Sequence, residues 1–309
     1  MLPDDVLLEI FDFYVNKDKD GYFKKEIEKW QRLVHVCHRW RSVVFGSSRR
    51  LNLRLVCTSD TPARDTLDIL PFLPLLIAAD GRRTESMDDI IAVLERSDRV
   101  VKIEFSSVND SGENLGMESV LPDSFLGGSA PRLEYLWLNR IPFPGLPKLL
   151  LSATHLVDLH LWDITHSGYI PPEAMVTVLS MLTSLERLSL QFKSPRSRPD
   201  WARRRLPPPS RSVLPVLTSI SFKGVCEYLE DIMTCINAPQ LDHLYIILFN
   251  QIIFDMPQFT QFISRSPTLE TFEKALVVFG YGAAWVKLSP QTSGLVLLRL
   301  KPVVSKKSI

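Results

Sequence analysis

The chain has 309 residues, of which 45% are hydrophobic and 23% charged, and its formal net charge is +1. This composition is close to that of an ordinary globular protein, so enough apolar residues are present for two domains or one extended array. The near-zero net charge gives no overall attraction to nucleic acid or to an anionic membrane.

The longest apolar run and the N-terminus both argue against a membrane or secreted protein. The run "LPFLPLLIAA" (Leu70–Ala79) contains two prolines and has about half the length of a bilayer-spanning helix. The start, "MLPDDVLLEI", carries acids where a signal peptide needs basic residues. We therefore expect a protein of the cytoplasm, the nucleus or both, without a membrane partner.

The first long polar stretch is "NKDKDGYFKKEIEKW" (Asn16–Trp30). Asp18, Asp20 and Gly21 fit the spacing of a calcium-binding EF-hand loop. The twelfth position, which needs a bidentate glutamate, is Ile27, and four lysines surround the supposed site. A polar turn between two helices is therefore favoured over calcium binding.

Two apolar stripes with helical spacing flank this polar stretch. Proline at position 3 and acids at positions 4 and 5 are typical of a first helical turn. The first stripe is Val6, Leu7, Ile10, Phe11 and Tyr14, and the second is Trp30, Leu33, Val34, Cys37, Trp40 and Val44. The two predicted helices form a hairpin that is too small to bury both faces alone. It must therefore pack on the rest of the chain or on a partner.

The residues of this hairpin resemble the F-box family over positions 1–45. "LPDDVLLEIFDFYV" matches the first half of the family pattern and "WQRLVHVCHRWRSVVF" the second, in a style similar to fungal members. The connector between the halves is longer than is usual in the family. The resemblance implies a non-covalent contact with a Skp-family adaptor, and through it a cullin. It assigns that contact to Leu2, Pro3, Leu7, Ile10, Phe11, Leu33, Val36, Cys37 and Trp40.

From about residue 46 to residue 302 a second pattern recurs, L-x-x-L-x-L with aliphatic or aromatic substitutes. Its clear copies are "VVKIEF" (Val100–Phe105), "LEYLWL" (Leu133–Leu138), "LVDLHL" (Leu156–Leu161), "LERLSL" (Leu185–Leu190), "LTSISF" (Leu217–Phe222) and "LDHLYI" (Leu241–Ile246). Weaker copies begin at Leu51, Leu73, Leu269 and Leu295. The pattern resembles leucine-rich repeats, so we expect an α/β fold in which parallel strands alternate with helices.

The stretches between the motifs support this expectation in part. "MDDIIAVLERS" (Met87–Ser97) and "PPEAMVTVLSML" (Pro171–Leu182) have helical periodicity. The asparagine or cysteine that commonly follows each motif in the family is replaced by Val108, Ile141, Ile164, Lys193, Val225 and Phe249. We therefore expect an irregular solenoid, and an ordinary α/β sheet domain stays open as the alternative.

Alternation along the expected strands predicts which side chains face away from the core. The open face should carry Lys102, Glu104, Ser106, Tyr135, Trp137, Asn139, Asp158, His160, Trp162, Arg187, Ser189, Gln191, Ser219, Ser221, Lys223, His243, Tyr245 and Ile247. Aromatic residues dominate binding hot spots, so candidate target-binding residues are Tyr135, Trp137, His160, Trp162, His243 and Tyr245. The open alternative is that a loop or the tail covers the aromatic residues and makes them core.

The segment "KSPRSRPDWARRRLPPPSRS" (Lys193–Ser212) has a different composition from the repeats. Between residues 194 and 212 it contains six arginines, five prolines and one aspartate, which predicts a disordered basic loop. A solvated insertion without a role is favoured over a loop that grips an acidic, phosphorylated or nucleic-acid partner. Residues 303–309 are expected to form a tail, and no folded nucleic-acid motif is present.

Signatures of enzymes and of metal sites are weak throughout. Gly280 and Gly282 have dinucleotide-loop spacing, but Trp285 occupies the third glycine position. Asp158, His160 and Asp163 have acid–base side chains without a recognisable nucleophile beside them. We expect no catalytic residue and no cofactor.

The four cysteines predict neither a disulfide framework nor a metal site. Cys37, Cys57, Cys226 and Cys235 include no C-x-x-C pair. Near "HVCHRW", a buried Cys37 between surface histidines, His35 and His38, is favoured over a zinc site.

Taken with the two resemblances, the sequence predicts a substrate-recognition subunit of a cullin-RING (SCF-type) ubiquitin ligase. The alternative is a repeat scaffold for protein interactions without a ligase role, and an enzyme with a new site on the open face is a third hypothesis.

Overall fold

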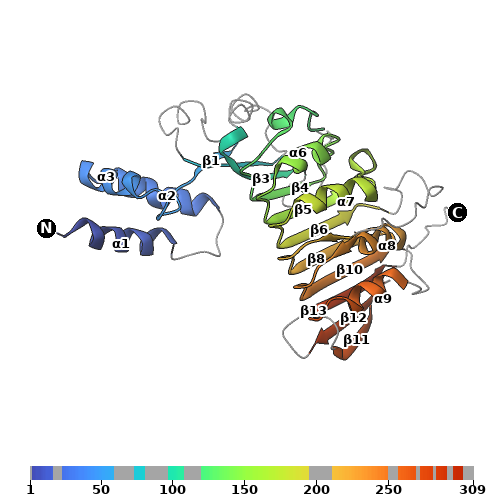
Figure 1. Cartoon of the computed structure of the whole chain (residues 1–309). Helices are drawn as coiled ribbons and strands as arrows, with labels where there is room; N and C mark the ends of the chain where they lie inside the picture. The colour runs from blue at the N-terminus through green and yellow to red at the C-terminus, as the bar shows by residue number, and fades with distance from the viewer. Residues whose placement is uncertain are drawn as a thin grey trace. The chain divides into compact units, whose positions relative to one another are not determined.

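The computed structural model describes residues 2–16, 23–58, 73–80, 97–107, 120–194, 211–249, 257–268, 272–280, 283–290 and 295–301. It is an α/β protein of helices and mainly parallel strands (Figure 1). The chain divides into two compact units, one of residues 1–79 and 83–102 and the other of residues 80–82 and 103–309.

The first unit begins with three helices, where the sequence predicts two. They are α1 (Asp4–Asn16), α2 (Phe23–Val34) and α3 (His38–Gly46). The prediction of one helix through Trp30 and Val44 is wrong because the chain breaks at Cys37, whose backbone is extended (φ −160°, ψ 167°). The Cys37 sulfur accepts a hydrogen bond from the Trp40 amide at 3.5 Å and so caps α3.

The three helices share a small core and are held together by an ion pair. Leu7 and Phe11 of α1 are buried, and the Phe11 ring lies 4.8 Å from that of Trp40, centroid to centroid. Arg39 of α3 donates to the Asp4 carboxylate at 2.9 Å, at the start of α1. One side of α1 is therefore fixed against α3.

Two parallel strands follow the helices in the first unit. β1 (Leu55–Thr58) pairs with β2 (Leu75–Asp80), and both begin within weaker copies of the repeat motif. Next come η1 (Ser97–Arg99) and β3 (Val100–Ser106), within which the two units divide. Nε and Nη2 of the buried Arg99 donate to the Leu73 carbonyl at 3.0 and 2.8 Å. These hydrogen bonds offset part of the cost of burying the charged guanidinium.

The second unit contains the main run of parallel strands. In sheet order they are β4 (Tyr135–Asn139), β5 (Asp158–Ile164), β6 (Arg187–Phe192), β8 (Ser219–Gly224), β10 (His243–Phe249) and β13 (Leu295–Lys301). The predicted parallel pairing is confirmed for these strands. Beyond β13 the sheet ends in antiparallel β12 (Ala283–Pro290) and β11 (Phe272–Gly280), so the expectation of a parallel strand at the weaker copy from Leu269 is wrong.

Helices connect the strands and lie along one face of this sheet (Figure 1). They are α6 (Leu146–Ser152), α7 (Pro172–Met181), α8 (Cys226–Cys235) and α9 (Pro257–Ser264), with short turns η2 (Phe125–Gly128) and η3 (His166–Gly168). β7 (Ser212–Val213) forms a separate parallel pair with β9 (Ile236–Asn237). The helix predicted near 171–182 is confirmed as α7, whereas residues 87–96 lie outside the described ranges.

Each clear copy of the motif after β3 begins in a turn and not in its strand. The first motif leucine is fully buried in all five copies, at Leu133, Leu156, Leu185, Leu217 and Leu241. Its amide donates to the carbonyl three residues earlier, as from Leu156 to Ala153 at 3.0 Å. The second residue of the motif then accepts from the next copy, as when the Glu134 carbonyl accepts from the Asp158 amide at 3.0 Å. This repeated turn aligns the strands and starts each of them two residues inside the motif.

We predict that the start of α6 tolerates no side chain at its N-cap, Gly145. A Cβ there would lie 2.8 Å from the Asp123 Cα and 2.9 Å from the Asp123 oxygen, both backbone atoms. Gly145→Ala should therefore lower the free energy of unfolding by about 1–3 kcal/mol in urea titrations. Gly46→Ala is the control because a Cβ at Gly46 meets nothing within 4 Å. Equal stability of the two variants would contradict the tight contact.

Candidate functional site

The second unit presents one sheet face that the helices do not cover (Figure 1). Motif residues such as Leu136, Leu159 and Leu188 are buried on the helix side, and the alternate residues form rows across the other face. One row follows the pairing of Trp137 with His160, His160 with Ser189, Ser189 with Ser221 and Ser221 with Tyr245. The predicted alternation is therefore confirmed, and this side is called the open face.

Four of the predicted target-binding residues form one aromatic cluster on β4 and β5. The ring centroids of Trp137 and Trp162 are 5.6 Å apart at 84°, and those of Tyr135 and His160 are 5.5 Å apart. His160 and Trp162 are 6.3 Å apart at 80°. Trp162 is 39% exposed and the other three are half-buried, so the cluster offers apolar ring surface to a partner.

The other two predicted target-binding residues do not join this cluster. His243 and Tyr245 lie on β10, and the register places β6 and β8 between them and β5. Several open-face positions are also less accessible than alternation predicts. Asp158, Ser189, Ser106 and Ile247 are buried.

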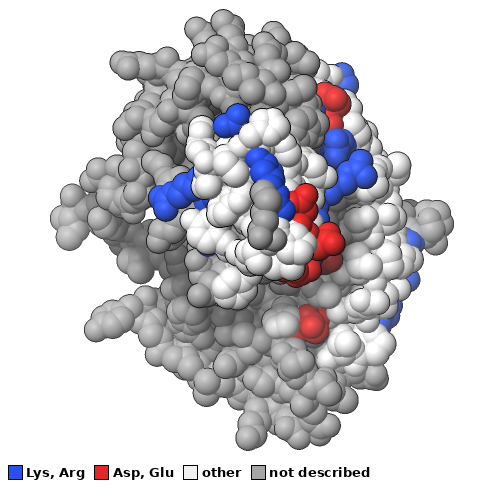
Figure 2. Space-filling view, turned by 90° about the vertical axis from the view of Figure 1, so that its left-hand side faces the viewer, with Lys and Arg blue, Asp and Glu red and all other residues white. Residues whose placement is uncertain are grey.

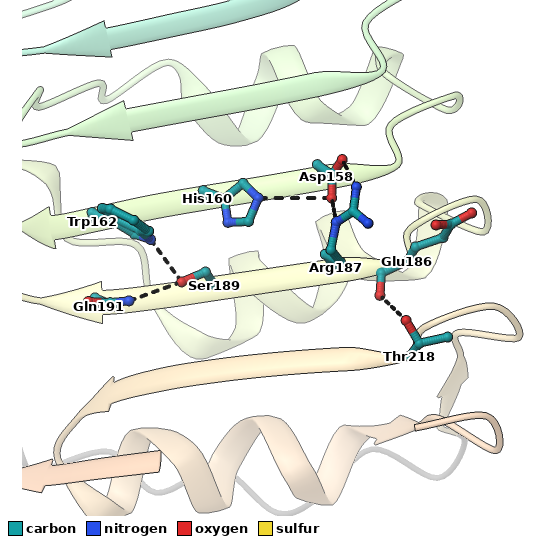
Figure 3. A network of polar contacts seen from close by, with 8 residues as sticks. All are labelled: Asp158, His160, Trp162, Glu186, Arg187, Ser189, Gln191 and Thr218. Carbon is teal, nitrogen blue, oxygen red and sulfur yellow. Dashed lines mark hydrogen bonds and ion pairs between the residues drawn. The ribbon is translucent and has the colours of Figure 1, made fainter. Parts of the chain in front are cut away.

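Hydrogen bonds hold the Trp162 ring in place (Figure 3). The Trp162 indole nitrogen donates to the Ser189 hydroxyl oxygen at 2.9 Å, and the Gln191 amide donates to the same oxygen at 3.2 Å. Because the indole N–H has its partner within the chain, the exposed part of the ring is an apolar surface with a fixed orientation.

The amino-terminal end of the open face carries a buried carboxylate with a bidentate partner (Figure 3). Arg187 donates to both oxygens of Asp158, with Nη2 to Oδ2 at 2.6 Å, and this hydrogen bond raises the pKa of Arg187. His160 Nε2 lies 3.9 Å from Asp158 Oδ1. Burial and then the nearby Glu104 and Asp158 carboxylates raise the pKa of Tyr135, which keeps its hydroxyl protonated.

The register brings together three residue types that acyl-transfer enzymes use, Asp158, His160 and Ser189. Alternation assigned Ser189 to the open face but did not show that it lies opposite His160. The Ser189 oxygen accepts two hydrogen bonds, and the Asp158 carboxylate is held by Arg187. With both oxygen lone pairs used, Ser189 is poorly placed for nucleophilic attack. The expectation of a non-catalytic protein stays a prediction.

A second polar cluster lies at the carboxyl ends of the strands and was not predicted. Asp163 accepts from Arg140 Nε at 3.1 Å and from Lys223 Nζ at 3.2 Å. Asp163 and Arg140 both have left-handed backbone (φ 48° and 56°), and the pairing of β5 with β6 shifts register beside Asp163. The Asp163 side chain thereby lies against both Arg140 and Lys223, an arrangement that simple alternation cannot predict.

This cluster predicts a pH-dependent contribution to stability. Burial alone would raise the pKa of Asp163, but Lys223 and Arg140 outweigh it and lower the pKa. Ionised Asp163 therefore stabilises the fold fully above the ordinary aspartate pKa of about 4, and the contribution is lost as the pH falls from there through the lowered pKa of the folded protein. Asp163→Asn should melt below wild type at pH 7, and the difference should shrink as the pH is lowered below about 4.

Asparagine is a matched replacement in this test because it tolerates a left-handed backbone. The measurement is the difference in Tm between the two proteins at pH 7 and below about pH 4. An equal difference at both would contradict the electrostatic origin of the contribution.

The predicted adaptor-binding residues divide between a buried and an exposed side of the first three helices. Leu7, Phe11 and Leu33 are buried and hold the helices together, and Trp40 is half-buried. Leu2, Pro3, Ile10, Val36 and Cys37 are exposed. The expectation of a buried Cys37 is therefore wrong, because its sulfur caps α3 from the surface.

The structure adds residues to the exposed side that the F-box resemblance did not assign to the adaptor contact. Val6, Phe13 and Tyr14 of α1 are exposed, and Phe13 is the most exposed of them at 65%. Leu2 precedes the helix, and Val6, Ile10 and Phe13 follow with helical spacing. These four residues, Leu2, Val6, Ile10 and Phe13, are called the α1 stripe.

Several predictions fall on parts of the chain that the structure does not describe. Residues 17–22 of the calcium-like stretch and 195–210 of the basic segment lie outside the described ranges, as does the tail. Within those ranges, no three His, Cys, Asp or Glu side chains are grouped to hold a metal ion. His35 and His38 are exposed.

The distribution of charged side chains and the character of the helices both bear on the class of partner. Basic and acidic side chains lie beside each other on the face seen in Figure 2, among uncharged residues. In the part of the chain that is described, no helix has the length and apolar character to cross a bilayer.

Comparison with protein-family models and with curated proteins finds no match to this chain.

Proposed function

We propose that this protein is the substrate-recognition subunit of an SCF-type cullin-RING ubiquitin ligase. Its first three helices dock on a Skp-family adaptor, and the open face of the second unit holds the target protein. The chain performs no chemistry in this role. It raises the effective concentration of the target near a ubiquitin-charged enzyme carried by other subunits.

The observation that carries the proposal is the α1 stripe. Leu2 is 51% exposed, Ile10 49% and Phe13 65%, on a helix whose opposite side is buried against α2 and α3. Burying one such side chain against a partner contributes about 1.5–3 kcal/mol. A row of them on one helix is therefore costly to leave in water and suits an apolar surface of another protein.

Two further features support the same role. Val36, between α2 and α3, is exposed and matches the second half of the F-box pattern. The aromatic cluster of the open face lies in the second unit, so one chain has two separate apolar surfaces. Two surfaces are what a protein needs if it is to connect an adaptor with a target.

The test is co-purification of the tagged full-length chain with a Skp-family adaptor and a cullin from eukaryotic cells. The proposal predicts that both co-purify. A chain that captures other proteins but neither of these subunits would instead support the alternative, a repeat scaffold without a ligase role.

A further inference from the structure

We infer that the open face binds an extended peptide segment of the target in which an acidic residue lies two positions from a large apolar residue. The inference rests on the proposed role of this face in holding a target, and it adds the chemical class of the segment. It is carried by Lys223, Asp163 and Trp162 together.

The first step is an excess of positive charge at the carboxyl ends of the strands. Lys223 and Arg140 both donate to the carboxylate of Asp163. Lys193 follows β6 at the same end, is exposed, and by alternation lies on the same face as Gln191. Among the described residues of this end of the open face, three basic side chains therefore meet one acidic side chain.

The second step is the hydrogen-bonding capacity of Lys223. Its side chain is 17% exposed, and Asp163 accepts from its Nζ at 3.2 Å. An ammonium group has three N–H donors. Within the described ranges Asp163 is its hydrogen-bond acceptor, so two donors remain for an acceptor from outside the chain. A partly buried cation gains more from such an acceptor than an exposed one does.

The third step is the position of the apolar surface. Trp162 immediately precedes Asp163, and its exposed ring is held by Ser189. Gln191 of β6 pairs with Lys223 of β8, and β6 is the neighbour of β5. Lys223 therefore lies two strands from β5, and its side chain extends back to Asp163. In an extended peptide, side chains two residues apart point the same way at about 7 Å. A large apolar residue on Trp162 therefore places an acid at the second residue along within reach of Lys223.

The donor count also favours a carboxylate over the alternatives. A basic segment would meet Lys223, Arg140 and Lys193 as like charges. A phosphoryl group carries close to two charges and three acceptor oxygens, more than the two remaining donors of Lys223 match. One Asp or Glu side chain, with two oxygens and one charge, fits them.

The experiment begins with selection of random displayed peptides on the full-length protein. The inference predicts that selected peptides are enriched in Asp or Glu within two residues of Trp, Phe, Tyr or Leu. One selected peptide is then synthesised with its acid kept, changed to Gln, changed to Lys, or replaced by phosphoserine. Binding by fluorescence anisotropy should weaken roughly tenfold with Gln and more with Lys.

Two substitutions in the protein should act in opposite directions on the acidic peptide. Lys223→Gln should weaken its binding roughly tenfold, because the acceptor loses its charged donor. Asp163→Asn removes the competing carboxylate and should tighten binding roughly threefold or more. Tighter binding cannot result from a damaged fold. Lys148→Gln, at an exposed lysine of α6 in the helix layer, should change nothing.

The inference is overturned by selection of no peptide, by absence of acid enrichment, or by tighter binding of the phosphoserine or lysine peptide. It is also overturned if Asp163→Asn weakens binding. Adaptor binding, measured on the same samples, is independent of these results. Loss of the acid preference with intact adaptor binding refutes this inference alone, and the reverse pattern refutes the ligase role while keeping the peptide site.

Discussion

Replacing Ile10 and Phe13 together by aspartate is expected to weaken binding to a Skp-family adaptor by at least about a hundredfold. Both side chains are exposed in the α1 stripe, so their loss removes apolar contact area without opening the helix core. Two aspartates would also have to be buried at the contact without counter-charges, which adds to the loss. The measurement is the Kd of the purified variant and adaptor by calorimetry.

The matched controls carry the same change at exposed apolar positions elsewhere. Leu151→Asp on α6 and Met181→Asp on α7 also introduce one acid each at an exposed apolar residue. They should leave the Kd within about twofold of wild type, as surface changes away from a contact do. Equal losses in the controls, or no loss in Ile10→Asp with Phe13→Asp, would show that the stripe is not the docking surface.

The second large effect is expected at the aromatic cluster. Trp137→Ala with Trp162→Ala should weaken target or selected-peptide binding by at least about thirtyfold, the effect of losing a hot spot. Adaptor binding should stay unchanged, because these residues lie in the second unit. The two affinities are measured side by side on the same preparation.

Loss of target binding in these variants must be distinguished from unfolding of the second unit. Trp137 is half-buried, so Trp162→Ala alone, at the most exposed ring of the cluster, is the variant that keeps the fold. Val213→Ala, at an exposed apolar residue of β7, is the matched control. If Trp162→Ala unfolds the second unit, the cluster is core. If the variant stays folded and binds the target as well as wild type, the cluster is not the docking surface.

The repeated motif made much of the second unit predictable. In the strand part of each motif the leucines are two residues apart. Because one face of the sheet is buried, this spacing determines which residues face the core. The residues of the open face therefore followed from sequence, and Trp137, His160 and Trp162 came out adjacent as expected. The first leucine of each motif, such as Leu156, was assigned to a strand although it lies in the preceding turn.

Features that depend on backbone irregularity or on long-range pairing were not predictable. The register shift beside Asp163 turns an acid toward Lys223, sixty residues along the chain. The antiparallel hairpin of β11 and β12 has no signal in a motif that describes parallel strands.

The first three helices show a different limit of sequence reasoning. Ile10 and Phe11 are adjacent in the F-box-like pattern, yet Ile10 is exposed and Phe11 is buried. A family pattern records which residues recur and does not separate those that hold the helices together from those that face a partner. The spacing of Val6, Ile10 and Phe13 carried that signal, because residues three and four apart lie on one side of a helix.

The most direct test of the account is a titration of the purified full-length chain with a purified Skp-family adaptor. A saturable one-to-one complex with a Kd of about 1 μM or below, lost on Ile10→Asp with Phe13→Asp, is the predicted result. No detectable complex at adaptor concentrations of about 100 μM, with a wild-type chain that is folded by circular dichroism, would contradict the ligase-receptor role.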